Sequence, residues 1–220
     1  MLTIAVDGYA SSGKGSVCKK LAKKLGIMHL DTGALYRAVG LYMIDNNVSY
    51  NDRDEVEREL LNIHIDVDYS EDGQITLLNG ENVSKRIRQN KVSDICSIIS
   101  QYSCVRELIL IIQREIADKY DVIMEGRDIT SHVLPNAEFK FLLNADIDIR
   151  AERRYKELIE KGESVTINQI KEELIERDRR DTQRKVAPLI LTEGTIYIDN
   201  SYMTIDEEVE LMYDIITGEN

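Results

Sequence analysis

Five short apolar segments recur along the chain and alternate with longer stretches that have the spacing of helices. They lie at residues 2–6, 28–31, 122–125, 139–143 and 196–199. Short apolar runs are typical of strands that are buried on both faces, as the strands of a parallel sheet are. The alternation of strands and helices therefore predicts an α/β fold with a five-stranded parallel sheet flanked by helices.

The region between the second and third of these segments has a different period. Apolar and polar residues alternate from Ile63 to Asp68, and Asp72-Gly73 and Asn79-Gly80 are turn signals. Alternation with a period of two predicts a strand with one buried face, and the turns predict its return. We expect a small antiparallel β insert at about residues 63–90.

Helical patterns fill most of the remaining chain. Residues 52–62 predict a helix with Val56, Leu60 and Leu61 facing inward. Residues 91–118 predict either one long helix or two abutting helices. The closing helix is expected to bury the apolar stripe Ile205, Val209, Met212 and Ile216.

The composition is that of a single globular domain. The chain has 220 residues, 43% hydrophobic and 31% charged, and its net charge of -12 argues against general nucleic-acid binding. No apolar run approaches the roughly 18 residues of a membrane-spanning helix. The opening residues lack the charged region of a signal peptide, and three cysteines without metal-ligand spacing predict reduced thiols. We therefore expect a cytoplasmic protein without membrane contacts.

The first strand leads into a glycine-rich segment that predicts a phosphate-binding loop. Gly8 and Gly13 enclose four residues, Lys14 follows, and a helical pattern starts at Ser16. Glycines let successive backbone N–H groups point at one anion, and the next helix N-terminus adds its own. Lys14 supplies a positive charge for the terminal phosphates. The predicted loop residues are Gly8, Tyr9, Ala10, Ser11, Ser12, Gly13, Lys14, Gly15 and Ser16.

The end of this loop departs from the common nucleotide-binding pattern. Gly15 stands where Ser or Thr is usual, and the hydroxyl comes one position later at Ser16. This Gly-Lys-Gly-Ser ending resembles that of nucleoside monophosphate kinases, in which Gly-Lys-Gly-Thr is common. We expect Ser16 to be the protein hydroxyl nearest to a Mg²⁺ ion that phosphates and water mainly coordinate.

Two further segments place charged side chains beside strand ends. Asp31 or Thr32 can cap the helix after the second strand, and Arg37 lies one turn inside it, where its guanidinium can bind a phosphate. Arg127 and Asp128 directly follow the third strand, and ligands of open α/β sheets bind beyond the carboxyl ends of strands. The alternative for Arg127 and Asp128 is a surface ion pair.

Arginine is concentrated late in the chain. Residues 150–184 hold seven of the fifteen arginines, which suggests a local anion site in an acidic protein. The spacing places two sets on common helix faces, namely Arg150, Arg153 and Arg154, and Arg177, Asp181 and Arg184. The alternative is an exposed helix face with internal ion pairs.

Three segments closely resemble bacterial cytidylate kinases. They are Asp31–Arg37, Gly126-Arg127-Asp128 followed by Pro135 and Ala137, and the Arg-Asp-x-Arg-Asp-x-x-Arg pattern of residues 177–184 followed by Ala187-Pro188-Leu189. The resemblance spans nearly the whole chain. Members of the family often continue with Gly-Thr after Gly-Arg-Asp, whereas this chain has Thr130-Ser131-His132. No role is assigned between Ile129 and Leu134.

The resemblance implies which side chains bind the nucleoside monophosphate. Ser97 and Arg106 would help to hold the cytosine and the monophosphate, and Asp181 would contact the sugar or base. Arg153 or Arg154 would also serve the transferred group. The implied substrate-binding set is Thr32, Arg37, Ser97, Arg106, Arg127, Asp128, Arg177, Asp181 and Arg184. The implied catalytic cations are Lys14, Arg127, Arg177 and Arg184.

The resemblance implies phosphorylation of CMP, and of dCMP, by ATP in pyrimidine nucleotide metabolism, with Mg²⁺ as the metal. It also implies the strand order 2-3-1-4-5 of P-loop kinases. Within one domain of residues 1–220 we expect a monophosphate-binding insert at about 63–90 and a helical lid at about 147–167. Nothing demands more than a monomer. Two alternatives remain open, namely a kinase for another acceptor such as UMP or a sugar-like metabolite, and a non-catalytic nucleotide-binding protein.

Overall fold

The computed structural model describes residues 1–71, 73–160 and 162–218. The chain divides into two compact units. The first consists of Met1–Met28 together with the chain from Tyr120 onward, and the second consists of His29–Lys119.

The first unit is built on a parallel sheet. β1 (Thr3–Gly8) pairs with β6 (Val122–Gly126) on one side and β7 (Phe139–Asn144) on the other, and β8 (Ile196–Asp199) pairs with β7. β2 (Met28–Asp31) begins where the N–H of Met28 donates to the carbonyl oxygen of Asp121 at 3.0 Å. The order along the five-stranded sheet is β2-β6-β1-β7-β8. The predicted parallel core and its strand order are confirmed.

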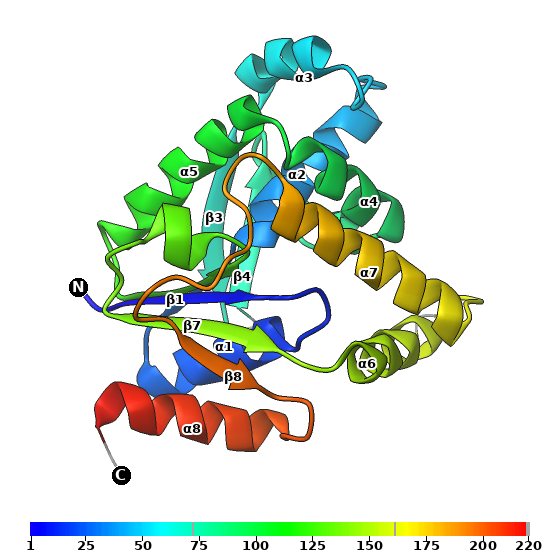
Figure 1. Cartoon of the computed structure of the whole chain (residues 1–220). Helices are drawn as coiled ribbons and strands as arrows, with labels where there is room; N and C mark the ends of the chain where they lie inside the picture. Colours follow the sequence, from blue (N-terminus) through cyan, green and yellow to red (C-terminus); the bar gives the residue numbers. More distant parts are fainter. Residues whose placement is uncertain (72, 161, 219–220) are drawn as a thin grey trace. The chain divides into compact units, whose positions relative to one another are not determined.

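Helices pack on the strands of the first unit (Figure 1). α1 (Lys14–Leu25) and α8 (Ile205–Thr217) pack side by side against apolar strand residues such as Ile4 and Phe141. α6 (Ile147–Glu160) and α7 (Ile167–Gln183) pack against each other around Leu158 and Leu174. Both pairs bury an apolar stripe and leave the charged face outside, as amphipathic helices do.

The second unit combines helices with the predicted small sheet. α2 (Thr32–Asp45) is apolar on nearly all sides and shares a core with α4 (Asn90–Ile99) and α5 (Ser103–Ala117). α2 and α4 pack closely at Gly40, where a Cβ would lie in ordinary van der Waals contact, 3.5 Å from the backbone N of Cys96. β3 (Ile65–Ser70), β4 (Gly73–Leu78) and β5 (Glu81–Asn82) form the antiparallel sheet.

The structure describes one of the two predicted turns and the break between the helices of residues 91–118. Asn79 and Gly80 have φ values of 49° and 84° and form the expected turn between β4 and β5, while Asp72 of the other turn lies outside the described residues. The stretch 91–118 is two helices, bent by 104° at their break. Together α4 and α5 have the length and composition of a membrane span, but no single helix in the described ranges is long and apolar enough.

Two predicted core positions are wrong. Leu61 is 91% exposed, because α3 (Arg53–Glu59) ends early and a 3₁₀ turn, Leu60–Asn62, carries the side chain outward. Ile205 is 46% exposed, because it is the first residue of α8 and lies beside the cap at Thr204. Val209 and Met212, further along α8, are buried as predicted.

Candidate functional site

The segment after β1 has the backbone of a phosphate-binding loop. Gly13 and Ser11 have φ values of 90° and 57°, and α1 begins at Lys14 directly after this turn. In the described part of the chain no side chain caps the N-terminus of α1, so a bound phosphate can take the place of a cap. Gly8 is required by space, since a Cβ there would come within 2.7 Å of the carbonyl oxygen of Leu143.

Two arginines of α6 hold the loop by its carbonyl oxygens. Arg150 donates from Nη1 to the oxygen of Ala10 at 3.1 Å and pairs with Asp178 of α7 at 2.6 Å. The N–H of Ala10 donates to the other oxygen of Asp178 at 3.4 Å. Arg153 donates to the oxygen of Ser12 at 3.2 Å. The two side chains therefore fix the curve of the loop.

A buried polar network supports the same loop from the end of β8. Asn200 donates from Nδ2 to the oxygen of Ser12 at 2.7 Å and to the Glu208 carboxylate at 2.9 Å, and it accepts from Arg153 at 3.1 Å. Burial raises the pKa of Glu208, while Asn200 and Arg153 oppose this shift. Charge patterning did not predict Asn200, because its partner Ser12 contributes a backbone atom far away in the sequence, and Glu208 acts through Asn200.

A carboxylate lies against the turn between the loop and α1. Glu125 is buried near the end of β6, and a Cβ on Gly15 would lie 3.0 Å from its Oε1. This contact explains the departure from the common pattern, since a Ser or Thr at position 15 would crowd the carboxylate. Ser16 follows and is exposed at the start of α1.

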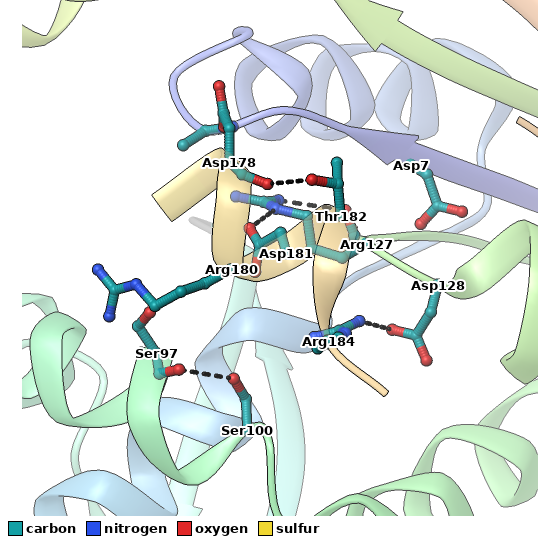
Figure 2. Close-up of polar contacts among 12 residues, drawn as sticks. Asp7, Ser97, Ser100, Arg127, Asp128, Asp178, Arg180, Asp181, Thr182 and Arg184 are labelled. Carbon is teal, nitrogen blue, oxygen red and sulfur yellow. Dashed lines mark hydrogen bonds and ion pairs between the residues drawn. The ribbon is translucent and has the colours of Figure 1, made fainter. Parts of the chain in front are cut away.

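The structure brings together the predicted charged residues that directly follow β6 and those at the end of α7. Arg127 donates from Nε to Asp181 at 2.8 Å, and Arg184 donates from Nη2 to Asp128 at 3.4 Å (Figure 2). Arg177 also lies close enough to act on Asp181. We call Arg127, Asp128, Arg177, Asp181 and Arg184 the arginine cluster.

Charge in this cluster is strongly coupled. Burial acts against the charge of Asp181, yet Arg127, Arg177 and Arg184 outweigh it and hold the pKa of Asp181 below its usual value. Burial likewise opposes the charge of Arg127, and Asp181 nevertheless raises the pKa of Arg127. Arginines and carboxylates therefore lie close together here, and Asp178 and Glu125 also act on Arg127.

The other predicted substrate-binding residues lie in the second unit, namely Thr32, Arg37, Ser97 and Arg106. Thr32 is the buried first residue of α2, and Asp31 caps this helix by accepting from the N–H of Ala34 at 3.1 Å. Arg37 pairs with the same Asp31 at 2.6 Å. A Cβ on Gly33 would come within 2.9 Å of the Arg37 guanidinium, so this glycine leaves room for the arginine.

Ser97 and Arg106 are linked through Ser100 near the junction of α4 and α5. Both are buried, and Arg106 donates to the carbonyl oxygen of Ser100 at 3.2 Å. The hydroxyl of Ser100 in turn donates to the carbonyl oxygen of Ser97 at 3.4 Å (Figure 2). The Oγ of Ser97 has no hydrogen-bond partner among the described residues. Tyr36, to which no role was assigned, lies under the Arg106 guanidinium at 5.5 Å.

Comparison with known proteins agrees with this geometry. The family model described as cytidylate kinase matches residues 4–218. A cytidylate kinase from Caldanaerobacter subterraneus subsp. tengcongensis is 44% identical over 97% of this chain and 93% of its own. One from Caldicellulosiruptor saccharolyticus is 42% identical over 99% of this chain and 98% of its own. One from Bacillus cereus is 37% identical over 99% of this chain and 96% of its own.

The solved structures add a likeness of fold. An uncharacterized protein from Eubacterium ventriosum has a TM-score of 0.53 to this chain at 15% identity, and the match covers 100% of both chains. At this identity the likeness concerns the fold alone. The family model and the relatives, by contrast, match this sequence over nearly its full length. The chain belongs to the cytidylate kinase family.

Proposed function

We propose that this protein transfers the γ-phosphoryl group of ATP to CMP, and to dCMP, to form ADP and the nucleoside diphosphate. The observation that carries the proposal is the arginine cluster beyond the end of β6, in the same unit as the phosphate loop. Such a concentration of arginine suits an acceptor that carries a phosphate of its own. A neutral acceptor such as a sugar would offer these arginines no anionic group to bind.

In this proposal each group of residues has a separate task. Lys14 and the backbone of residues 8–16 bind the donor phosphates. Arg37, Arg127, Arg177 and Arg184 neutralise the acceptor and the moving phosphoryl group. No general base is required, because the attacking phosphate oxygen is already ionised. Most of the catalysis then comes from positioning and charge.

Base recognition is assigned to the second unit and to Asp181. The buried Ser97 hydroxyl without a partner among the described residues is a candidate for a hydrogen bond to cytosine, because such a group costs stability until a ligand satisfies it. Arg106 would share this task with Ser97. Thr32 would contact the monophosphate, while Asp128 and Asp181 would contact the sugar or base.

The residues at the loop fit Mg²⁺. The described chain contains no cluster of three or more His, Cys, Asp or Glu side chains that could hold a metal by itself. Glu125 lies against Gly15 and the hydroxyl of Ser16 is close in sequence, so the protein would add these oxygens to a shell made mainly of phosphate and water. When bound, Mg²⁺ supplies charge neutralisation between the donor phosphates.

Two segments would adapt to the substrates. We assign the insert at about residues 63–90 to the monophosphate and the segment at about 147–167 to a lid that excludes water. Arg150 and Arg153 anchor the first half of α6 on the loop, so the closing motion would involve the end of α6 and the turn that follows it. We also expect a monomeric cytoplasmic enzyme with nucleotides as its only partners.

The test is ADP release from ATP and Mg²⁺ with CMP, dCMP, UMP, AMP or no acceptor, run side by side. We expect CMP and dCMP to lead, and Lys14→Ala to lower turnover by about a hundredfold or more in a folded protein. Ser97→Ala should raise the KM for CMP and leave the KM for ATP unchanged. Faster turnover with UMP than with CMP would agree with a kinase activity and overturn the assignment of residues to cytosine recognition. No ADP release with any of the four acceptors would favour a nucleotide-binding protein without this activity.

A further inference from the structure

Asp7 is a buried acid that the proposed reaction does not use. It lies in β1 immediately before Gly8, and its side chain is fully buried. Its carboxylate accepts from the N–H of Ile129 at 2.8 Å, from the N–H of Thr130 at 2.9 Å and from the Thr130 hydroxyl at 2.7 Å. A buried carboxylate is costly unless such donors surround it, so its presence in the core calls for an explanation.

The donors belong to a turn that directly follows Arg127 and Asp128. Residues Ile129–Val133 form a single π-helical turn, in which the carbonyl oxygen of Asp128 accepts from the N–H groups of His132 and Val133 at 2.9 and 3.1 Å. The first N–H groups of a helical turn have no acceptor within the turn itself. Asp7 supplies that acceptor from a different strand, and it therefore fixes the start of the turn.

We propose that Asp7 and Thr130 form a positioning pair that fixes Arg127 and Asp128 relative to the phosphate loop. Asp7 is joined to Gly8 by one peptide bond, and Thr130 follows Asp128 by two residues. The carboxylate thus connects the strand that leads to the donor phosphates with the turn that carries two members of the arginine cluster. The inference rests on the proposed function, because it concerns the placement of acceptor-binding side chains.

Thr130 contacts Asp7 with its side chain as well as with its backbone N–H, so the hydroxyl can be removed while the backbone contact stays. The contact gives Thr130 a role that the sequence pattern did not assign. It also predicts an asymmetry, since a loosened turn should impair the use of CMP more than the binding of ATP.

The test compares two variants of one side chain. Thr130→Val keeps the shape and removes the hydroxyl, whereas Thr130→Ser keeps the hydroxyl. We expect Thr130→Val to raise the KM for CMP about tenfold, which corresponds to one buried hydrogen bond, with the KM for ATP within about twofold. Thr130→Ser should restore a KM close to that of the wild type. Asp7→Asn, in which one acceptor oxygen becomes a donor, should shift the KM for CMP further in the same direction.

A purely structural role is excluded by a matched control. Ile198→Val removes one buried methyl group from β8 and should lower the melting temperature without a selective effect on CMP. Thr130→Val with an unchanged KM for CMP, or with equal changes for CMP and ATP, would overturn the positioning role while the wild-type activity stands. A wild-type enzyme without monophosphate turnover would overturn the proposed function, and the positioning role with it.

Discussion

Four of the seven arginines of residues 150–184 form two groups that look alike in sequence and differ in the structure. Arg150 and Arg153 on α6 donate to carbonyl oxygens of the phosphate loop. Arg177 on α7 and Arg184 directly after it join Arg127 around the carboxylates of Asp181 and Asp128. The first group stabilises the shape of the donor loop. The second group lies among carboxylates, and in the proposed function it binds the phosphate of the acceptor.

The difference lies in what the guanidinium groups contact. A carbonyl oxygen of the loop can leave its arginine only if the backbone itself moves, so Arg150 and Arg153 are fixed as long as the loop is folded. A cluster of arginines and carboxylates can instead share its donors with a phosphate, because arginine offers five N–H groups in a fixed plane. Charge and spacing in a sequence therefore indicate arginines near a site without showing which of them meet the substrate.

The largest expected effect follows from removing a member of the arginine cluster. Arg127→Ala should lower kcat with CMP by about 10²–10³-fold, because a positioned cation at the moving phosphoryl group is lost. The kcat of Arg127→Lys should lie between those of the wild type and Arg127→Ala, since lysine keeps the charge and loses the two-point geometry of the guanidinium. The measurement is steady-state kinetics at saturating CMP and ATP. An alanine variant with wild-type kcat would place Arg127 in the structural group.

Replacing an arginine that contacts the phosphate loop should mainly lower the stability of the protein. Arg150→Met should lower the free energy of unfolding by about 2 kcal/mol, because the half-buried Asp178 would lose its ion pair and keep the weaker contact with the N–H of Ala10. The double variant Arg150→Met with Asp178→Leu should recover much of this loss. Denaturant unfolding measures both. A strong loss of kcat without a loss of stability would instead assign Arg150 to the phosphate-binding group.

Acids held by arginines and acids held by neutral donors should differ in their pH dependence. Burial raises the pKa of Asp7 from 3.8 to about 6, although the hydrogen bonds from Thr130 and Ile129 oppose the shift. The native state therefore binds a proton before the unfolded state does, and Asp7 contributes stability as the pH falls through 6. Asp181 has a lowered pKa, so its contribution is present at neutral pH and is lost only below its ordinary pKa.

The measurement is the free energy of unfolding of the wild type and of Asp7→Asn at two pH values. Between about pH 7.5 and about pH 5, the difference should move in favour of the wild type by about 1 kcal/mol. Asp181 should contribute little to the change over this range. A difference that stays constant over this range would show that Asp7 keeps an ordinary pKa.

Much of the fold follows from local patterns in the sequence. The short apolar runs predicted every strand of the parallel sheet, and Gly8, Gly13 and Lys14 predicted the loop, because those signals depend on neighbours within a few residues. The helix ends were less predictable. Leu61 fits an inward helical stripe, but the change to a 3₁₀ turn after Glu59 depends on packing and not on spacing.

The parts of the site that were missed depend on contacts between distant segments. Asn200 meets the carbonyl oxygen of Ser12, 188 residues away, and Asp7 meets Thr130, 123 residues away. Backbone acceptors leave no pattern in a sequence, so the contacts of Arg153 with Ser12 and Asn200 could not be predicted from its spacing. Asp7, an acid directly after an apolar run in a strand, was a signal in the sequence that could have indicated a buried contact.

The smallest effect is expected for an arginine that adjoins the cluster only in sequence. Arg179 is exposed and pairs with Glu176 one turn earlier on α7, at 2.8 Å. Its neighbours in the chain, Arg177 and Arg180, bracket it so closely that composition alone would include it in the anion site. Exposed ion pairs contribute little, so Arg179→Ala should leave kcat and both KM values within about twofold of the wild type. A loss as large as that of Arg127→Ala would mean that position in the sequence, and not the contact of each side chain, decides which arginines serve the phosphate.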